Sequence, residues 1–172
     1  MGMTPLKYPL EQLLEIKNKR FDQAVKVLEE KKAALVREEE KLRVVTKERD
    51  EVKQHRKDKL QQLREGLDSG LAFVKVQQMK VYLKVVDERV AEKEKKVRDQ
   101  KVQVDNAVKQ VDLATKEMYQ RKKDVEKIEM HRKEWEKEVA YLIEQKAGHE
   151  QDDQGSATHA MKKRERQNRE TS

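Results

Sequence analysis

Apolar residues recur at alternating intervals of three and four along most of the chain. Two interleaved series of every seventh residue show the pattern in the second half. One series is Leu83, Val90, Val97, Val104, Val111, Met118, Val125, Arg132 and Val139, and the other is Val86, Lys93, Gln100, Ala107, Ala114, Arg121, Ile128, Trp135 and Leu142. This spacing keeps the apolar side chains on one side of a helix. Its persistence over many heptads is typical of a coiled coil rather than of a globular helix.

A similar pattern in the first half starts at Leu10 and is not interrupted by glycine or proline before Gly66. The segment 65–70 contains both Gly66 and Gly70 and is the only strong break, since glycine past a helix end can adopt the left-handed conformation. The sequence therefore predicts an all-α fold, in which residues 10–147 form an antiparallel coiled-coil hairpin of two long helices with a turn near 66–70. Residues 1–9, which contain Pro5 and Pro9, are expected to be irregular. Residues 148–172 lack a sustained apolar period and are expected to be a disordered basic tail.

The two series of apolar positions also predict which residues face each other. In an antiparallel hairpin, facing residues have a constant sum of residue numbers, and a turn near 66–70 gives a sum of about 135. Polar residues within the series then fall against apolar ones, where long side chains can reach water with their charged ends. The expected pairs include Leu28 with Ala107, Val52 with Leu83, Glu38 with Val97, Arg56 with Met79 and Leu42 with Lys93.

The composition is that of long, solvated helices. Of the 172 residues, 44% are charged and 4% are aromatic, and the chain has only five glycines and two prolines, which are few for a globular enzyme domain. The net charge of +7 arises from 41 basic and 34 acidic residues that are interleaved, so a solvated helix surface explains it better than a nucleic-acid site. No apolar run is long enough to span a membrane, and the N-terminus lacks a signal core. We expect a soluble intracellular protein.

No catalytic, metal or cofactor site is expected. The chain has no cysteine, and its four histidines show no spacing that would build a metal site. The serines Ser69, Ser156 and Ser172 all lie in segments expected to be flexible, and there is no glycine-rich phosphate loop. Carboxylates on a pair of solvated helices lack the cleft that would perturb their pKa. The sequence therefore indicates a protein that is not an enzyme.

Apolar residues beyond Val125 continue the period past the expected start of the first helix. Two interpretations are open: Leu6 and Tyr8 fold back over Ile128 and Trp135, or the surface binds another protein. A second excess of apolar residues surrounds the turn, where it either closes the tip or forms another docking surface. These residues are Leu60, Leu63, Leu67, Leu71, Phe73, Val74, Val76, Met79, Val81, Tyr82, Leu83 and Val85.

The N-terminal residues resemble a known family. The block Tyr8-Pro9-Leu10, followed by Leu13-Leu14, Ile16-Lys17, Arg20 and Ala24, is similar to the start of the type III secretion stalk proteins of the YscO/FliJ family. Three further segments are most similar to the chlamydial members: Gln62-Leu63-Arg64-Glu65, residues 79–86 and Lys133-Glu134-Trp135. The resemblance covers nearly the whole chain.

This resemblance implies a fold similar to the paired terminal helices of the rotary ATPase gamma subunit. It also implies a non-enzymatic stalk that binds the hexameric secretion ATPase and links it to the membrane protein of the export gate. Such a stalk works in the cytoplasm, peripheral to the inner-membrane base of the apparatus, and some members also bind substrate chaperones. The residues expected to bind the ATPase are Leu10, Leu13, Leu14, Ile16, Lys17, Arg20, Ile128, Trp135, Val139 and Leu142. Those expected to bind the gate or a chaperone are Leu60, Leu63, Leu67, Phe73, Met79 and Tyr82.

Two alternatives stand beside this function. A generic coiled-coil scaffold or holdase chaperone would bind unfolded clients through the two ends of the hairpin. A nucleic-acid-binding coiled coil would use the basic residues from Lys162 to Arg169. The second is disfavoured because no basic helix leads directly into leucine heptads and no aromatic stacking platform is present. We therefore expect no nucleic-acid partner.

Overall fold

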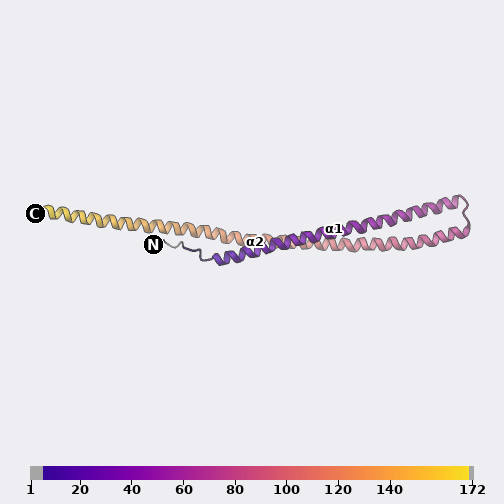
Figure 1. The fold of residues 1–172 in the computed structure, drawn as a ribbon, viewed down its shortest axis with the longest axis horizontal. Coiled ribbons are helices and arrows are strands. Elements are labelled where there is room, and N and C mark those ends of the chain that lie inside the picture. Colours follow the sequence, from indigo (N-terminus) through magenta and orange to yellow (C-terminus); the bar gives the residue numbers. More distant parts are fainter. Residues whose placement is uncertain (1–5, 171–172) are drawn as a thin grey trace. The chain divides into compact units, whose positions relative to one another are not determined.

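A computed structural model describes residues 6–170 and contains two long helices. Helix α1 spans Glu11–Asp68 and helix α2 spans Phe73–Glu170, with no strand among the described residues (Figure 1). The all-α class predicted from the heptads is confirmed. Of the segment 1–9, which is expected to be irregular, residues 6–9 lie outside the helices, and residues 1–5 are outside the described part of the chain. Leu10, expected in the first helix, also precedes α1.

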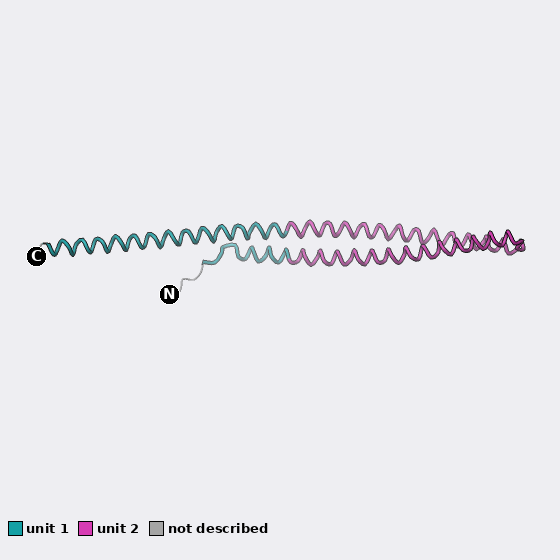
Figure 2. Tube along the Cα trace, turned by 90° about the horizontal axis from the view of Figure 1, so that it is seen from above, with its two compact units in different colours: residues 1–21, 121–172 teal, residues 22–120 magenta. Residues whose placement is uncertain are grey.

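The chain divides into two units, each built from a part of α1 and a part of α2 (Figure 2). Unit 2 comprises residues 22–120 and includes the turn between the helices. Unit 1 combines residues up to 21 with residues from 121 onward. Within each unit the two helix segments run antiparallel. In unit 1, Glu11 contacts Arg132 and Lys17 contacts Asp124, and in unit 2, Lys53 contacts Glu94 and Arg56 contacts Asp87.

The core of each unit is a thin seam between the two helices. In unit 2, Val86 has none of its surface exposed. In unit 1, Leu14 is 5% exposed. No polar or charged residue is buried among residues 6–170. The other buried apolar residues are Tyr8, Ala24, Leu28, Leu63, Val76, Val97, Ala114 and Val125.

A glycine cap at Gly70 ends α1. Gly70 has a positive φ of 75°, the left-handed conformation that glycine adopts without a steric penalty. The Leu71 amide donates to the Gly66 carbonyl at 2.8 Å and the Gly70 amide donates to the Leu67 carbonyl at 3.3 Å, which together form a Schellman motif. Gly66 lies inside the helix, where a Cβ would come within 2.9 Å of Leu71 Cδ2. Glycine at position 66 therefore leaves space for the Leu71 side chain. Glycine at position 70 allows the backbone to reverse direction.

The register predicted from the sequence is wrong by about one helical turn. Glu38, expected opposite Val97, instead accepts hydrogen bonds from Gln100 Nε2 at its side chain (2.6 Å) and at its backbone carbonyl (3.0 Å). Arg56, expected opposite Met79, pairs with Asp87. The cause lies in the turn: α1 continues to Asp68 rather than ending at Gly66, and each residue added before the turn moves the facing pairs by two.

Ion pairs across the seam of unit 2 are solvent-exposed. Lys53 Nζ lies 2.8 Å from Glu94 Oε1, and this hydrogen bond holds the pKa of the Glu94 carboxyl below its usual value. The hydrogen bond from Gln100, followed by that from Lys41, lowers the pKa of Glu38. Lowered carboxyl pKa values mean that these contacts stabilise the fold at neutral pH and are lost on acidification. Because water screens them, they specify the pairing of the helices more than they stabilise it.

The C-terminal segment differs from the expectation of disorder. Helix α2 continues through residues 148–170, and these residues are almost all exposed. Gly148 and Gly155 have nothing within 4 Å of an added Cβ, so neither marks a turn or a close contact, and an interior glycine costs a helix only about 1 kcal/mol. The alanine, methionine, lysine, arginine and glutamate that follow are good helix formers. Residues 171–172 lie outside the described part of the chain.

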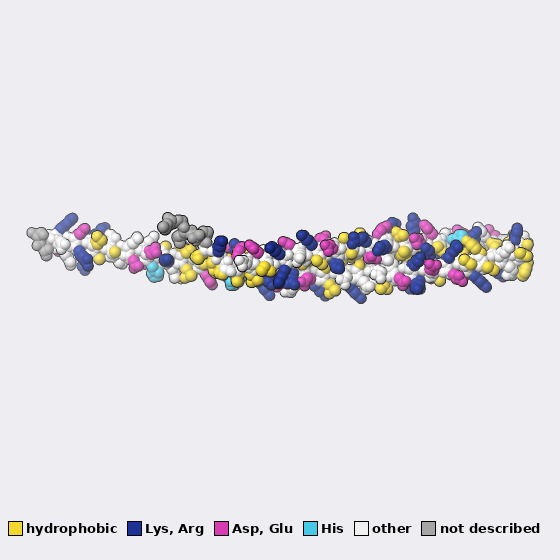
Figure 3. All heavy atoms as spheres, turned by 60° about the horizontal axis from the view of Figure 1, so that its bottom comes forward, with side chains coloured by type: hydrophobic (Ala, Val, Ile, Leu, Met, Phe, Trp, Pro, Cys, Tyr) yellow, Lys and Arg dark blue, Asp and Glu magenta, His cyan; other side chains and the backbone are white. Residues whose placement is uncertain are grey.

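The surface follows the same division between seam and solvent. Basic and acidic side chains interleave along the visible face (Figure 3). Within residues 6–170, neither helix holds a stretch that is long and apolar enough to cross a membrane.

Replacing Val86 by alanine tests the importance of the seam. The substitution removes two methyl groups from the most buried position and should lower the free energy of unfolding by about 2 kcal/mol. The matched control is Val36→Ala, because the Val36 side chain is 62% exposed and its truncation should change stability by less than about 0.5 kcal/mol. Urea unfolding monitored by circular dichroism measures both, and equal midpoints for the two variants would contradict the observed seam.

Candidate functional site: apolar surfaces of the two units

Tyr8 anchors the N-terminal segment to α2 in unit 1. Its side chain is only 5% exposed and meets Trp135 edge-on, with ring centroids 5.4 Å apart and an interplanar angle of 61°. Its hydroxyl lies 2.5 Å from His131 Nδ1, and the Arg132 guanidinium lies 6.0 Å from the ring centroid. Of the two interpretations that the sequence left open, the structure shows the fold-back for Tyr8 on Trp135, whereas Leu6 is exposed.

Charged residues fix the start of α1 beside this contact. Arg132 Nη1 lies 3.4 Å from a Glu11 carboxylate oxygen, and Lys17 Nζ lies 3.9 Å from Asp124 Oδ2. A carboxylate in the first turn of a helix also interacts favourably with the helix dipole. A hollow of about 390 Å³ remains open here, with Tyr8 and Trp135 among the residues that line it. Trp135 is therefore only partly covered.

The residues expected to bind the ATPase fall into two groups in unit 1. Leu14 is buried, and Leu10, Lys17, Ile128, Trp135 and Val139 are partly buried. Leu13, Ile16, Arg20 and Leu142 are exposed, as are Tyr141 and Ile143. We call five of the exposed apolar residues of unit 1 the terminal surface: Leu13, Ile16, Tyr141, Leu142 and Ile143.

The terminal surface is not one patch. Glu11 at the start of α1 pairs with Arg132, so Leu142 lies ten residues further along α2, roughly 15 Å at the helical rise. Leu13 and Ile16, in contrast, lie within the part of α1 that α2 accompanies. The structure therefore places Leu142 apart from Leu13 and Ile16, whereas Ile128 lies between Asp124 and Arg132, which both pair with α1.

At the turn in unit 2, the residues expected to bind the gate or a chaperone divide in the same way. Leu63 is buried, and Leu60 and Met79 are partly buried. Leu67, Phe73 and Tyr82 are exposed.

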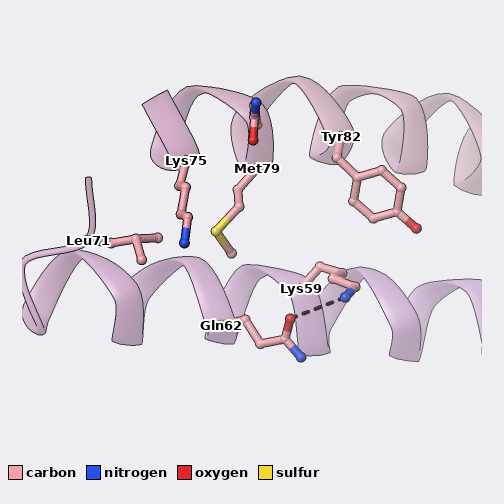
Figure 4. A pocket seen from close by; sticks show the side chains of 7 residues that line it. Lys59, Gln62, Leu71, Lys75, Met79 and Tyr82 are labelled. Atoms are coloured by element: carbon pink, nitrogen blue, oxygen red, sulfur yellow. Dashed lines mark hydrogen bonds between the residues drawn. The ribbon is translucent and has the colours of Figure 1, made fainter. Parts of the chain in front are cut away.

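A hollow of about 460 Å³ opens between the helices near the turn. Figure 4 shows Lys75 and Met79 projecting from α2 toward α1, opposite Lys59 and Gln62 of α1. Tyr82 lies at its far end, where its hydroxyl is 2.8 Å from His55 Nε2.

Two histidines have roles that the sequence did not reveal. His131 contacts Tyr8, and His55 contacts Tyr82. From the sequence, these histidines were assessed only as metal ligands. No periodic signal could have shown these pairs, because each joins residues far apart in the chain. Among residues 6–170 no group of three or more histidine, aspartate or glutamate side chains could hold a metal ion.

Comparison with known proteins identifies the family. The model of the YscO-like protein family matches residues 5–165. The chain belongs to the YscO-like family. Its fold is also similar to the solved structure of a YscO homolog from Chlamydia trachomatis, with a TM-score of 0.86 and 42% sequence identity. That similarity covers 92% of this chain and 98% of the chlamydial one, while no curated protein matches.

Membership of the YscO-like family confirms the resemblance drawn from residues 8–24. The family and the similar chlamydial structure together support a stalk protein of type III secretion.

The contact between Tyr8 and Trp135 can be tested with the intrinsic fluorescence of the chain, because Trp135 is its only tryptophan. Tyr8→Ala should move the emission maximum to longer wavelength and increase quenching by iodide, since the ring that covers Trp135 is removed. Tyr8→Phe keeps the edge-on ring and loses only the hydroxyl that meets His131, so its emission should stay close to that of the wild type. Emission unchanged in Tyr8→Ala would show that Tyr8 does not cover Trp135 in solution.

Proposed function

We propose that this chain is a non-enzymatic stalk that binds the hexameric secretion ATPase through the terminal surface of unit 1 and the export gate through the exposed residues at the turn. It acts in the cytoplasm at the inner-membrane base of the apparatus. The observation that carries the proposal is the distribution of exposed apolar residues in a YscO-like chain. Leu13, Ile16 and Leu142 are exposed in unit 1, and Phe73 and Tyr82 in unit 2.

The geometry narrows the set of residues proposed for the ATPase. Leu14 is buried in the seam and Trp135 is partly covered by Tyr8, so both act by holding unit 1 together. Leu13, Ile16 and Leu142 are among the apolar side chains that a partner can reach, and exposed apolar surface is typical of sites that bind another protein. Arg20, which is also exposed, adds a cation beside Ile16 on α1.

The same reasoning applies at the turn. Leu63 is buried between the helices and serves the fold, whereas Phe73, Leu67 and Tyr82 are exposed. We propose that these residues contact the cytoplasmic part of the export gate or a substrate chaperone. The stalk then acts by joining partners, with no chemistry of its own.

Introducing negative charge into the terminal surface tests the ATPase contact. The double variant Leu13→Glu, Ile16→Glu should reduce co-purification with the secretion ATPase at least tenfold, because both side chains are exposed and would place carboxylates in an apolar interface. Neither substitution touches a buried residue, so helix content should be retained.

The matched control is the double variant Val36→Glu, Val44→Glu, which changes two exposed apolar residues of α1 in unit 2. This control should bind the ATPase as the wild type does. Unchanged ATPase binding by Leu13→Glu, Ile16→Glu, or equal loss in the control, would overturn the assignment of the terminal surface.

A further inference from the structure

Helix α2 carries a second apolar face near the turn. Phe73, Val74, Val81 and Val85 are exposed, Phe73 by 75% and Val81 by 62%, whereas Val76 and Val86 of the same helix are buried against α1. At about 100° per residue, the exposed residues lie on the opposite side of the helix from the buried ones. We call them, together with Tyr82, the tip stripe. The pairing of α1 with α2 leaves this stripe uncovered, and hydrophobic side chains reach the surface at the turn end of Figure 3.

Within residues 71–86 the charges are of one sign. Residues 71–86 contain Lys75, Lys80 and Lys84 but no aspartate or glutamate, although the whole chain holds 34 acidic residues. By helical geometry, Lys80 and Lys84 follow one edge of the stripe and Lys75 the other. None of these three lysines makes an ion pair among the described residues, unlike Lys53 and Lys93 further along the seam.

The surface along the stripe is shallow and open. A groove of about 590 Å³ runs along it from Phe73 to Val85 and is lined by the apolar residues of the stripe together with Gln77 and Gln78. The hollow between the helices adjoins it and shares Gln78 and Tyr82. There the Lys59 and Lys75 side chains flank an apolar floor that includes Met79 (Figure 4).

We propose that the tip stripe binds an acidic amphipathic helix of a partner protein, which lies along α2 as a third helix. The proposal rests on the proposed function, in which the turn region docks a partner, and it specifies the chemistry of the partner's segment. Apolar side chains at intervals of three and four fill the groove between Phe73 and Val85. Carboxylates on both flanks of the partner helix meet Lys75 on one edge and Lys80 and Lys84 on the other.

Charge and polarity favour this occupant over two others. A second copy of the chain would bring the same three lysines against each other, because a symmetric dimer uses the same patch on both subunits. A hydrocarbon surface would take Gln77 and Gln78 out of water without offering hydrogen bonds to their amides. A protein helix can satisfy these amides with its own polar side chains.

A designed peptide tests the proposal directly. The probe is a labelled helix of roughly 21 residues with leucine at the a and d positions and glutamate at e and g, whose like charges keep it from pairing with itself. Fluorescence anisotropy with the full chain measures its affinity, and hydrogen exchange locates its footprint. We expect protection of residues 73–85, and affinity at least tenfold weaker for the same peptide with lysine in place of glutamate.

Variants of the full chain separate the tip stripe from general attraction to a basic protein. The triple variant Lys75→Glu, Lys80→Glu, Lys84→Glu and the single variant Val81→Glu should each weaken peptide binding at least tenfold. The matched control is Lys101→Glu, Lys109→Glu, Lys116→Glu, which makes the same change in net charge at exposed lysines of α2 away from the stripe. This control should bind within twofold of the wild type.

Four results would overturn the proposal. They are equal binding of the two peptides, no protection of residues 73–85, protection by phosphatidylserine vesicles in preference to the acidic peptide, and a dimer in light scattering that Val81→Glu dissociates. The proposed function is tested separately by binding of the wild-type chain to the cytoplasmic part of the export gate. No binding there refutes the gate contact, whereas gate binding that survives the triple lysine variant refutes only the tip stripe.

Discussion

Two packed helices can cover only one face of each other. In this chain each helix therefore buries a single stripe of residues, which includes Leu14 on α1 and Val86 on α2. The rest of the circumference of each helix faces solvent. A third helix or a sheet would normally cover further apolar residues, and nothing within the described chain does so. The exposed side chains of the tip stripe and the terminal surface are a direct consequence of this constraint. For that reason the same packing rule explains both the fold and the places where partners are proposed to bind.

The turn decides how the two stripes meet. The Schellman motif at Gly70 sets the last residue of α1, and through it the register of every facing pair in unit 2. Contacts such as Lys53 with Glu94 and Gln100 with Glu38 then join the two helices across the seam. In unit 1 other contacts hold the two helix segments together: Tyr8 packs on Trp135, and Glu11 pairs with Arg132 where the N-terminal segment enters α1. Short-range chemistry at these few residues positions long elements that have little core of their own.

Periodicity predicted the two helices and the hairpin, because these depend on which residues are apolar, and it left the fold-back of Tyr8 open. It could not predict the register, since Gly66 and Gly70 are equally plausible ends of α1 until Leu71 is seen to occupy the space beside Gly66. The helical state of residues 148–170 was also missed, because composition reports the lack of a core and says little about local helix propensity. Of the candidate site residues, Leu13, Ile16, Leu142, Leu67, Phe73 and Tyr82 are exposed, while Leu14 and Leu63 are buried. Sequence alone cannot separate these classes, since a heptad shows that a residue is apolar and not what covers it.

The central claim is that unit 1 and the turn region serve different partners through different exposed residues. Hydrogen exchange of the full chain, alone and with the secretion ATPase, tests it most directly. The claim predicts slower exchange at residues 10–20 and 128–142 when the ATPase is present, with residues 73–85 unchanged. Protection confined to residues 73–85, or no protection in unit 1, would contradict it.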